Sequence, residues 1–152
     1  MRKLFILVIL VLSALFAQTA MSQQAEVMST VNQFVDSFNK GDAKTAAASC
    51  ADQTIIIDEF PPHEWHGSGA CSTWMNDFDA DAKKNAITDG VVTLAKPKHV
   101  DVSGDHAYVV IPADYAYKKA GKPMKETNSI LTVVLQKGAN GWRITGWSWS
   151  KS

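Results

Sequence analysis

The first half of the chain carries apolar residues at helical spacing. Residues 25–40 predict an amphipathic helix, and Gly41 directly after it is a helix stop signal. A second, short helix is predicted from Asp42, a favourable N-cap, and a third over about residues 71–82. The apolar positions that define the three faces are Val27, Val31, Phe34, Val35 and Phe38; Ala43, Ala46, Ala47 and Cys50; and Cys71, Trp74, Met75, Phe78 and Ala82.

The remaining segments have the patterns of strands. Residues 53–57 are short and β-branched, which predicts a buried strand that ends before Pro61 and Pro62. Pro97 and Pro112 lie inside later strand patterns and predict bulges or edge positions that would curve the sheet. We therefore expect an α+β domain with three helices first and a curved antiparallel sheet after them. The sheet stretches, in which the apolar period is two and between which glycine-containing turns occur, are near residues 88–102, 106–118, 123–137 and 141–150.

The first 22 residues have the pattern of a secretory signal peptide. Two basic residues precede an almost unbroken apolar stretch at residues 4–17. Small residues favour cleavage after Ser22, and cleavage after Ala20 is the weaker alternative. A retained membrane anchor is the other reading, but the apolar stretch is short against the roughly 20 residues that span a bilayer. We expect a periplasmic or secreted domain, residues 23–152, with no stable membrane insertion after cleavage.

The composition is that of one globular domain. Apolar residues make up 46% of the chain, and 15 basic residues balance 15 acidic ones. Because the net charge is zero and the basic residues do not cluster, we expect no nucleic-acid partner. No phosphate loop, dinucleotide fingerprint or Gly-x-Ser-x-Gly motif is present in the sequence, so we expect no cofactor.

The chain contains two cysteines, Cys50 and Cys71. In an oxidising compartment they could form a disulfide that stabilises the domain by about 3 kcal/mol. Both positions also fit the apolar faces of predicted helices, where free cysteines are often buried. The sequence gives no Cα separation, so both alternatives stay open.

Several short signals strengthen the fold prediction. They are the turn at residues 39–42, the acidic Asp58 at a strand end, Gly67 before the third helix, and a final strand at residues 141–150. In this order they resemble the nuclear transport factor 2-like superfamily, most closely its SnoaL-like and ketosteroid-isomerase-like branch, from about residue 25 to the end. The resemblance implies a cone-shaped α+β barrel, a cystatin-like roll with a pocket at its open end, and a homodimer formed through the sheet. Members include isomerases, dehydratases, polyketide cyclases and binding modules without catalysis.

Asp58 is the strongest catalytic candidate. It follows a buried strand, where desolvation would raise its pKa and make it a base near neutral pH; an ordinary turn carboxylate is the alternative. The resemblance implies that Asp58 stands where ketosteroid isomerases hold their proton-shuttling aspartate. Those enzymes carry an oxyanion-binding tyrosine where this chain has Phe34, and a late-strand acid that residues 129–136 lack. Isomerisation by that mechanism is therefore disfavoured.

The segment His63-Glu64-Trp65-His66 invites a search for a metal site. It does not match the helical zinc motif, and no well-spaced third ligand accompanies the two histidines. We expect no metal. His66 is instead predicted to lie at the pocket rim, where it could polarise a ligand oxygen and assist Asp58.

The later strands supply candidate pocket residues. Tyr115 shares its strand face with apolar residues, which predicts that it points inward and that Asp114 points outward. Alternation places Trp147 and Trp149 on one face of the last strand and Ile144 on the other, and leaves open which face is interior. The predicted ligand is a small apolar or aromatic molecule. The candidate ligand-binding residues are Phe34, Trp65, Trp74, Tyr115 and Trp147.

Three functions fit these patterns. The first is an exported small-molecule-binding domain with an apolar, aromatic-lined pocket. The second is an acid-base enzyme of the polyketide-cyclase, dehydratase or isomerase kind, with Asp58 as base and His66 or Tyr115 assisting. The third is a dimeric protein-interaction module that uses the exposed face of the sheet.

Overall fold

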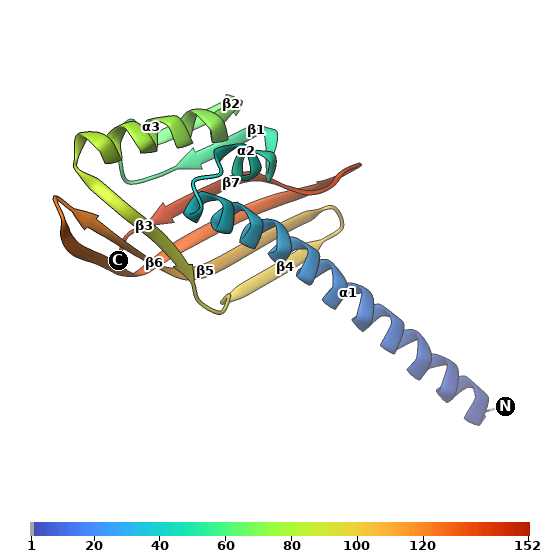
Figure 1. Cartoon of the computed structure of the whole chain (residues 1–152). Helices are drawn as coiled ribbons and strands as arrows, with labels where there is room; N and C mark the ends of the chain where they lie inside the picture. The colour runs from blue at the N-terminus through green and yellow to red at the C-terminus, as the bar shows by residue number, and fades with distance from the viewer. Residues whose placement is uncertain (1) are drawn as a thin grey trace.

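The computed structural model describes the backbone of residues 2–152 and the side chains of residues 21–152. The three predicted helices and the predicted α+β class are confirmed (Figure 1), although two strands come before the third helix. A short strand at Glu64–Ser68 was not predicted. The helices are α1 (Arg2–Asn39), α2 (Ala43–Ala48) and α3 (Ala70–Lys84), and the strands are β1 (Cys50–Ile57), β2 (Glu64–Ser68), β3 (Ile87–Leu94), β4 (His99–Ser103), β5 (His106–Lys119), β6 (Lys122–Gly138) and β7 (Gly141–Ser150).

All seven strands belong to one mixed sheet. Its order is β2-β1-β7-β6-β5-β3, and β4 also pairs with β5. The prediction of a wholly antiparallel sheet is wrong at one pair, because β1 runs parallel to β7. No hairpin joins these two strands: nearly the whole domain separates them along the chain, and that long connection permits a parallel pairing. The sheet therefore extends past the last strand of the chain and carries the β1–β2 hairpin at its edge.

The two prolines mark where the sheet is interrupted. The predicted stretch 88–102 is two strands, β3 and β4, and Pro97 lies in the connection between them. Both strands pair with β5, and Pro112 lies where the partner of β5 changes from β4 to β3. There the backbone N–H of Ala95 donates to the Pro112 carbonyl at 2.9 Å. Because proline has no N–H to donate, a position at a change of partner costs the sheet little.

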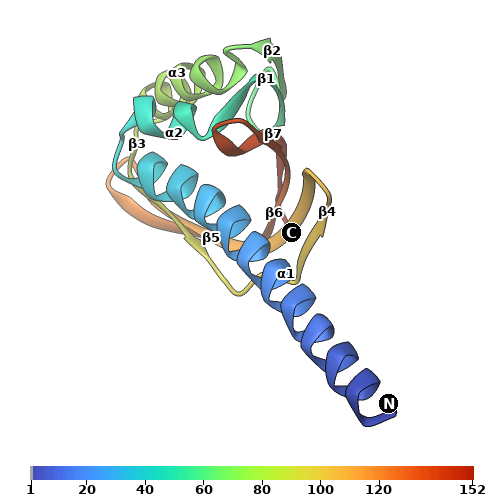
Figure 2. The ribbon, with the colours of Figure 1, turned by 90° about the vertical axis from the view of Figure 1, so that its right-hand side faces the viewer.

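The core lies between the concave face of the sheet and the helices. Figure 2 shows the sheet curving around the C-terminal half of α1, with α2 and α3 beside it. Val27 and Val31 of α1 are fully buried against this face, as their helical spacing predicted. Opposite them lie inward-facing strand residues, which are Val109 and Ile111 of β5, Leu131, Val133 and Leu135 of β6, and Ile144 of β7.

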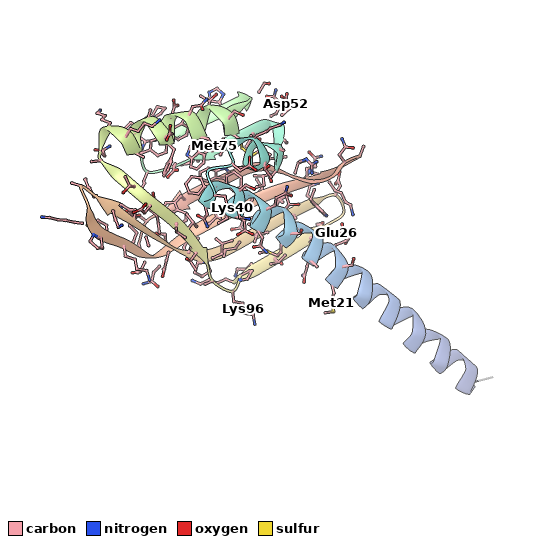
Figure 3. All side chains as sticks on the ribbon, viewed as in Figure 1. Met21, Glu26, Lys40, Asp52, Met75 and Lys96 are labelled. Carbon is pink, nitrogen blue, oxygen red and sulfur yellow. A yellow bond between two sulfur atoms is a disulfide. The ribbon has the colours of Figure 1, made fainter. Side chains whose placement is uncertain are left out.

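The helix α1 begins further upstream than the periodicity of residues 25–40 predicted. Figure 3 shows Met21 on the part of α1 that projects from the domain, whereas Glu26 lies where the helix reaches the sheet. Glu26 forms an ion pair with Lys137 of β6 at 2.9 Å. The apolar stretch of the predicted signal peptide lies outside the residues whose side chains are described, and cleavage near Ser22 stays a prediction. Among the residues that the structure describes, no helix is long and apolar enough to cross a membrane.

The two cysteines are joined by a disulfide. Cys50 opens β1 rather than lying on the face of α2, so that part of the prediction is wrong, while Cys71 lies in the first turn of α3 as predicted. Their Cα atoms are 6.5 Å apart, within the range that a disulfide requires. The disulfide links the first turn of α3 to the first residue of β1. A buried structural disulfide is typical of proteins that fold in an oxidising compartment.

Candidate functional site

A cavity of about 530 Å³ lies between α1, α3 and the concave face of the sheet. We call it the main cavity. Its walls come from elements far apart in the sequence: two helices, the loop after β1, and strands β3, β5, β6 and β7. Its surface is mainly apolar, and its charged lining residues are Asp58, Glu59, Asp81, Lys84, Lys119, Glu126 and Lys151. Its lining includes Phe34, Val35 and Phe38 of α1, Trp74 and Phe78 of α3, Asp58, Glu59 and Phe60 after β1, Tyr115 and Tyr117 of β5, Glu126 and Leu131 of β6, and Trp147, Trp149 and Lys151 at the end of the chain.

Asp58 points into the main cavity because it continues the alternation of β1. Ile56 is fully buried, and Asp58 follows two positions later on the same side. The other two isoleucines of this strand, Ile55 and Ile57, are 57% and 55% exposed on the outer face. The prediction that all three isoleucines form a buried strand is therefore wrong for two of them. The loop that follows is closed by a hydrogen bond from the Asp58 N–H to the His63 carbonyl at 3.1 Å.

The Asp58 carboxyl is held by two donors. One oxygen accepts the backbone N–H of Glu59 at 2.7 Å, and the other accepts the Nε1–H of Trp74 at 2.8 Å. Burial raises the pKa of Asp58 to about 6, although both hydrogen bonds act to lower it and the neighbouring Glu59 and Glu126 act to raise it. A carboxyl with this pKa exchanges its proton readily near neutral pH, which is the property of a general acid or base.

Trp74 is the centre of a continuous aromatic wall. Its ring meets Trp147 edge-on at 4.7 Å and lies 5.5 Å from the rings of both Phe38 and Phe78. Phe34 contacts Trp74 and Trp147 from α1 at 6.3 and 5.9 Å. Aromatic pairs at these separations are mutually stabilising and form rigid surfaces. Phe34, Trp74 and Trp147, three of the predicted ligand-binding residues, thus lie together on one side of the cavity.

A register shift determines which face of β7 is interior. Strand β6 pairs Val134 with Gly146 but Leu135 with Ile144, so β7 has one extra residue at this point. The extra residue returns Ile144 and Trp147 to the same side, and both are buried. The prediction that Ile144 and Trp147 face opposite ways is therefore wrong. All the large apolar residues of β7 face the interior, and Trp147 and Trp149 line the main cavity.

Tyr115 points inward, and Asp114 lies on the outer side in an ion pair with Lys125 at 2.8 Å. The Tyr115 ring stacks on Tyr117 at 4.9 Å. Burial, followed by the nearby Tyr117 and Glu126, raises the pKa of Tyr115 to about 12, so its hydroxyl remains a neutral donor. Tyr115 also lines a second cavity of about 570 Å³ near the end of α1, which we call the side cavity. Tyr115 therefore stands between the two cavities.

Two acidic side chains at the mouth of the cavity were missed by the sequence analysis. Lys151, the penultimate residue, contacts Glu126 at 2.7 Å and Glu59 at 3.1 Å. Glu126 also accepts the Tyr117 hydroxyl at 3.3 Å. Residues 129–136 contain no acid, and Glu126 lies three residues before that stretch. Register was the missing signal, because β6 pairs Glu126 with Tyr115, a residue already placed inside.

Two predicted site residues lie elsewhere. His66 is exposed and is paired with Ile55 at the outer edge of the sheet, so it does not reach the main cavity. Trp65 is buried, but it lies behind Phe60 at 4.9 Å and donates its Nε1–H to Asp77 at 2.8 Å instead of lining the cavity. Both misplacements follow from β2, which the sequence pattern does not predict. In a strand, two neighbouring residues point to opposite faces. Within residues 21–152, no three His, Cys, Asp or Glu side chains gather in a way that could hold a metal ion.

A family comparison agrees with this geometry. The SnoaL-like domain profile matches residues 27–151, nearly the whole chain apart from the predicted signal peptide. The chain belongs to the SnoaL-like domain family. No curated protein sequence matches it. The family match agrees with the fold of this SnoaL-like domain, and the residues that line its main cavity determine which ligands fit.

Solved structures of the nuclear transport factor 2-like superfamily share the fold of this SnoaL-like domain. An NTF2-like protein with a cystatin-like fold from Novosphingobium aromaticivorans has a TM-score of 0.72 at 14% identity, covering 92% of this chain and 89% of that one. A ketosteroid isomerase-like protein from Erwinia carotovora has a TM-score of 0.67 at 16% identity, covering 85% and 95%. An NTF2-like superfamily protein from Salmonella enterica has a TM-score of 0.70 at 20% identity, covering 86% and 92%. At these identities the likeness establishes the fold of the SnoaL-like domain and leaves its chemistry to its own residues.

Proposed function

We propose that the chain is an exported protein that binds a small apolar or aromatic molecule in the main cavity. The observation that carries this proposal is the cavity of about 530 Å³ with a continuous aromatic wall around Trp74. Ligand sites in proteins are concave and mostly apolar, with a few polar groups that fix orientation. Here Asp58 and Glu126 are such groups. The predicted signal peptide and the disulfide between Cys50 and Cys71 support export.

Two matched variants of α3 test this proposal. Ala82 lines the main cavity, whereas Ala80 is exposed on the same helix and lies outside the cavity. Ala82→Trp should fill the space, and Ala80→Trp should add the same side chain to solvent. In a panel of aromatic and alicyclic compounds, binding should quench tryptophan fluorescence and raise the Tm of the parent protein and of Ala80→Trp, but not of Ala82→Trp. If no compound has either effect on the parent, or if Ala82→Trp binds as well as Ala80→Trp, the proposal fails.

An acid-base enzyme is the second candidate, because the pKa of Asp58 is about 6 inside the cavity. In this role Asp58 would accept a proton from a bound substrate, and Tyr115 would donate a hydrogen bond to the oxygen that becomes negative. The position of His66 on the outer face removes it from this mechanism. Asp58→Asn should then abolish turnover and leave ligand affinity within a few fold. An unchanged rate in this variant would exclude Asp58 as the base.

We also propose that the outer face of the sheet forms a homodimer. Ile55, Val134 and Tyr108 are exposed apolar residues, and the register places them in one row across four strands, with Gly146 between the first two. An apolar row of this kind on a sheet face is typical of an interface. Sedimentation should find a dimer that Val134→Lys dissociates. Val91→Lys, at an equally exposed position on β3, should leave the dimer intact.

A further inference from the structure

Glu126 is a charged side chain whose hydrogen bonding is half complete. Its side chain is only 10% exposed, and it lines the main cavity. One carboxylate oxygen, Oε1, accepts from Lys151 and from the Tyr117 hydroxyl. The other, Oε2, is fully buried and has no partner. A buried carboxylate oxygen without a donor is costly, so a donor supplied from within the cavity would be strongly favoured.

The surroundings of Glu126 select the kind of donor. Asp58, Glu59 and Asp81 line the same cavity. So do Lys84 and Lys119, while Lys151 is already bound between Glu59 and Glu126. Burial is the main cause of the raised pKa of the inward-facing Tyr115, and Glu126, Asp58 and Glu59 add to it, so the acids act together on this side of the cavity. Aromatic side chains make up much of the remaining wall. A wall of aromatic rings beside the carboxylates of Asp58 and Glu126 is an environment that stabilises an organic cation, through ion pairing and cation–π attraction.

We infer that the main cavity is selective for aromatic amines, whose ammonium group donates to Glu126 and approaches Asp58 while the ring packs against the wall around Trp74. This inference rests on the proposed ligand-binding function and names the chemical class of its ligand. The ammonium pairs with the Glu126 carboxylate, which can turn its unpartnered oxygen toward the cavity when the cation arrives. A neutral hydroxyl would supply the hydrogen bond without the charge, and a carboxylate would be repelled by both acids.

Three test compounds of the same shape separate these possibilities. Titration calorimetry at pH 7.5 compares 2-(1-naphthyl)ethylamine, 2-(1-naphthyl)ethanol and 1-naphthylacetate on the full mature protein. We expect the amine to bind about tenfold more tightly than the alcohol, and the acid to bind weakest, because a charge-assisted hydrogen bond is about twice as strong as a neutral one. Equal binding of amine and alcohol, or tighter binding of the acid, would overturn the inference and leave the ligand-binding function standing. Absence of binding by all three would overturn both.

A pair of variants assigns the selectivity to Glu126. Glu126→Gln keeps the shape and removes the charge, and should reduce amine affinity about tenfold while changing alcohol affinity less than threefold. Asp114→Asn is the matched control: it also removes a carboxylate paired with a lysine, at 2.8 Å, but on the outer side of the neighbouring strand. It should leave the amine affinity unchanged. If Glu126→Gln binds the amine as the parent does, the assignment is wrong. If that variant fails to fold, the ranking of the three compounds on the parent protein still decides the inference.

Discussion

Replacing Asp58 by Asn tests the central electrostatic feature of the site, which is a carboxyl whose burial destabilises its ionised form. The Asn side chain has nearly the same shape and carries no charge. It can still accept one of the two donors that hold Asp58, the Glu59 N–H or the Trp74 Nε1–H, and it loses the other bond. The protonated Asp58 carboxyl likewise has one oxygen that serves as a donor, so this loss applies to the ionised form. The effect of ionisation can therefore be measured as a change in stability with pH.

The expected magnitude follows from the pKa of Asp58 in the folded and unfolded chain. Burial raises it from 3.8 to about 6, so the folded protein holds this proton more tightly than the unfolded chain does. The stability supplied by the protonated form is fully present below pH 3.8 and is lost as the pH rises to about 6. At about 1.4 kcal/mol per pH unit, the loss amounts to ~3 kcal/mol. The free energy of unfolding of Asp58→Asn minus that of the parent should therefore increase by ~3 kcal/mol between pH 3.5 and pH 7.5.

Urea unfolding of both proteins across this pH range gives the difference directly, because the titrations they share cancel. A difference that stays constant from pH 3.5 to pH 7.5 would refute the reasoning, since it would mean that Asp58 has an ordinary pKa. Trp74→Phe provides the opposite perturbation. It removes a donor that lowers the pKa of Asp58, so the pKa should rise above that of the parent, and carbon NMR of the carboxyl should record the change.

Two further predictions concern the framework of the cavity. Cys50→Ser should lower the free energy of unfolding by about 3 kcal/mol, and a thiol assay on the denatured, unreduced parent protein should detect no free thiol from Cys50 or Cys71; two free thiols would contradict the disulfide. Gly90→Ala should weaken binding of aromatic ligands and lower stability by roughly 1–3 kcal/mol, because its Cβ would lie 2.4 Å from the Tyr115 hydroxyl and push that ring toward the cavity. Gly138→Ala, whose Cβ would meet no atom within 4 Å, is the control, and equal effects of the two glycine variants would contradict this account.

Much of the fold could be predicted because its helices and hairpins are determined locally. The helical spacing of Val27, Val31 and Phe34 identified the buried face of α1, and the glycine turns located the hairpins of the later sheet. The parallel pairing of β1 with β7 could not be predicted, because it joins segments about ninety residues apart with no local signal. The strand β2 was missed because Trp65 is its only buried residue, which is too few for a period of two.

The candidate site was predicted where side-chain direction follows simple alternation. Asp58 and Tyr115 both lie inside, as expected. Neither is separated from its buried neighbours on its own strand by an extra residue, so the alternation is preserved. Trp147 was assigned relative to Ile144 by alternation, and one extra residue in β7 made that assignment wrong. A bulge leaves no mark in the apolar pattern when both faces carry large residues. Glu126 likewise became visible only through its register with Tyr115.

Two acidic features that cost stability lie at one cavity. Asp58 is buried with a raised pKa, Glu126 leaves a buried oxygen without a partner, and the space beside both is open to a ligand. Most of the remaining interior consists of apolar residues such as Ile111 and Leu135. A chain selected only for stability would replace the two acids with apolar residues, since buried carboxylates without full hydrogen bonding destabilise a fold. Their presence at one site, enclosed by rigid aromatic rings, is the physical argument for the proposal that this cavity binds the ligand.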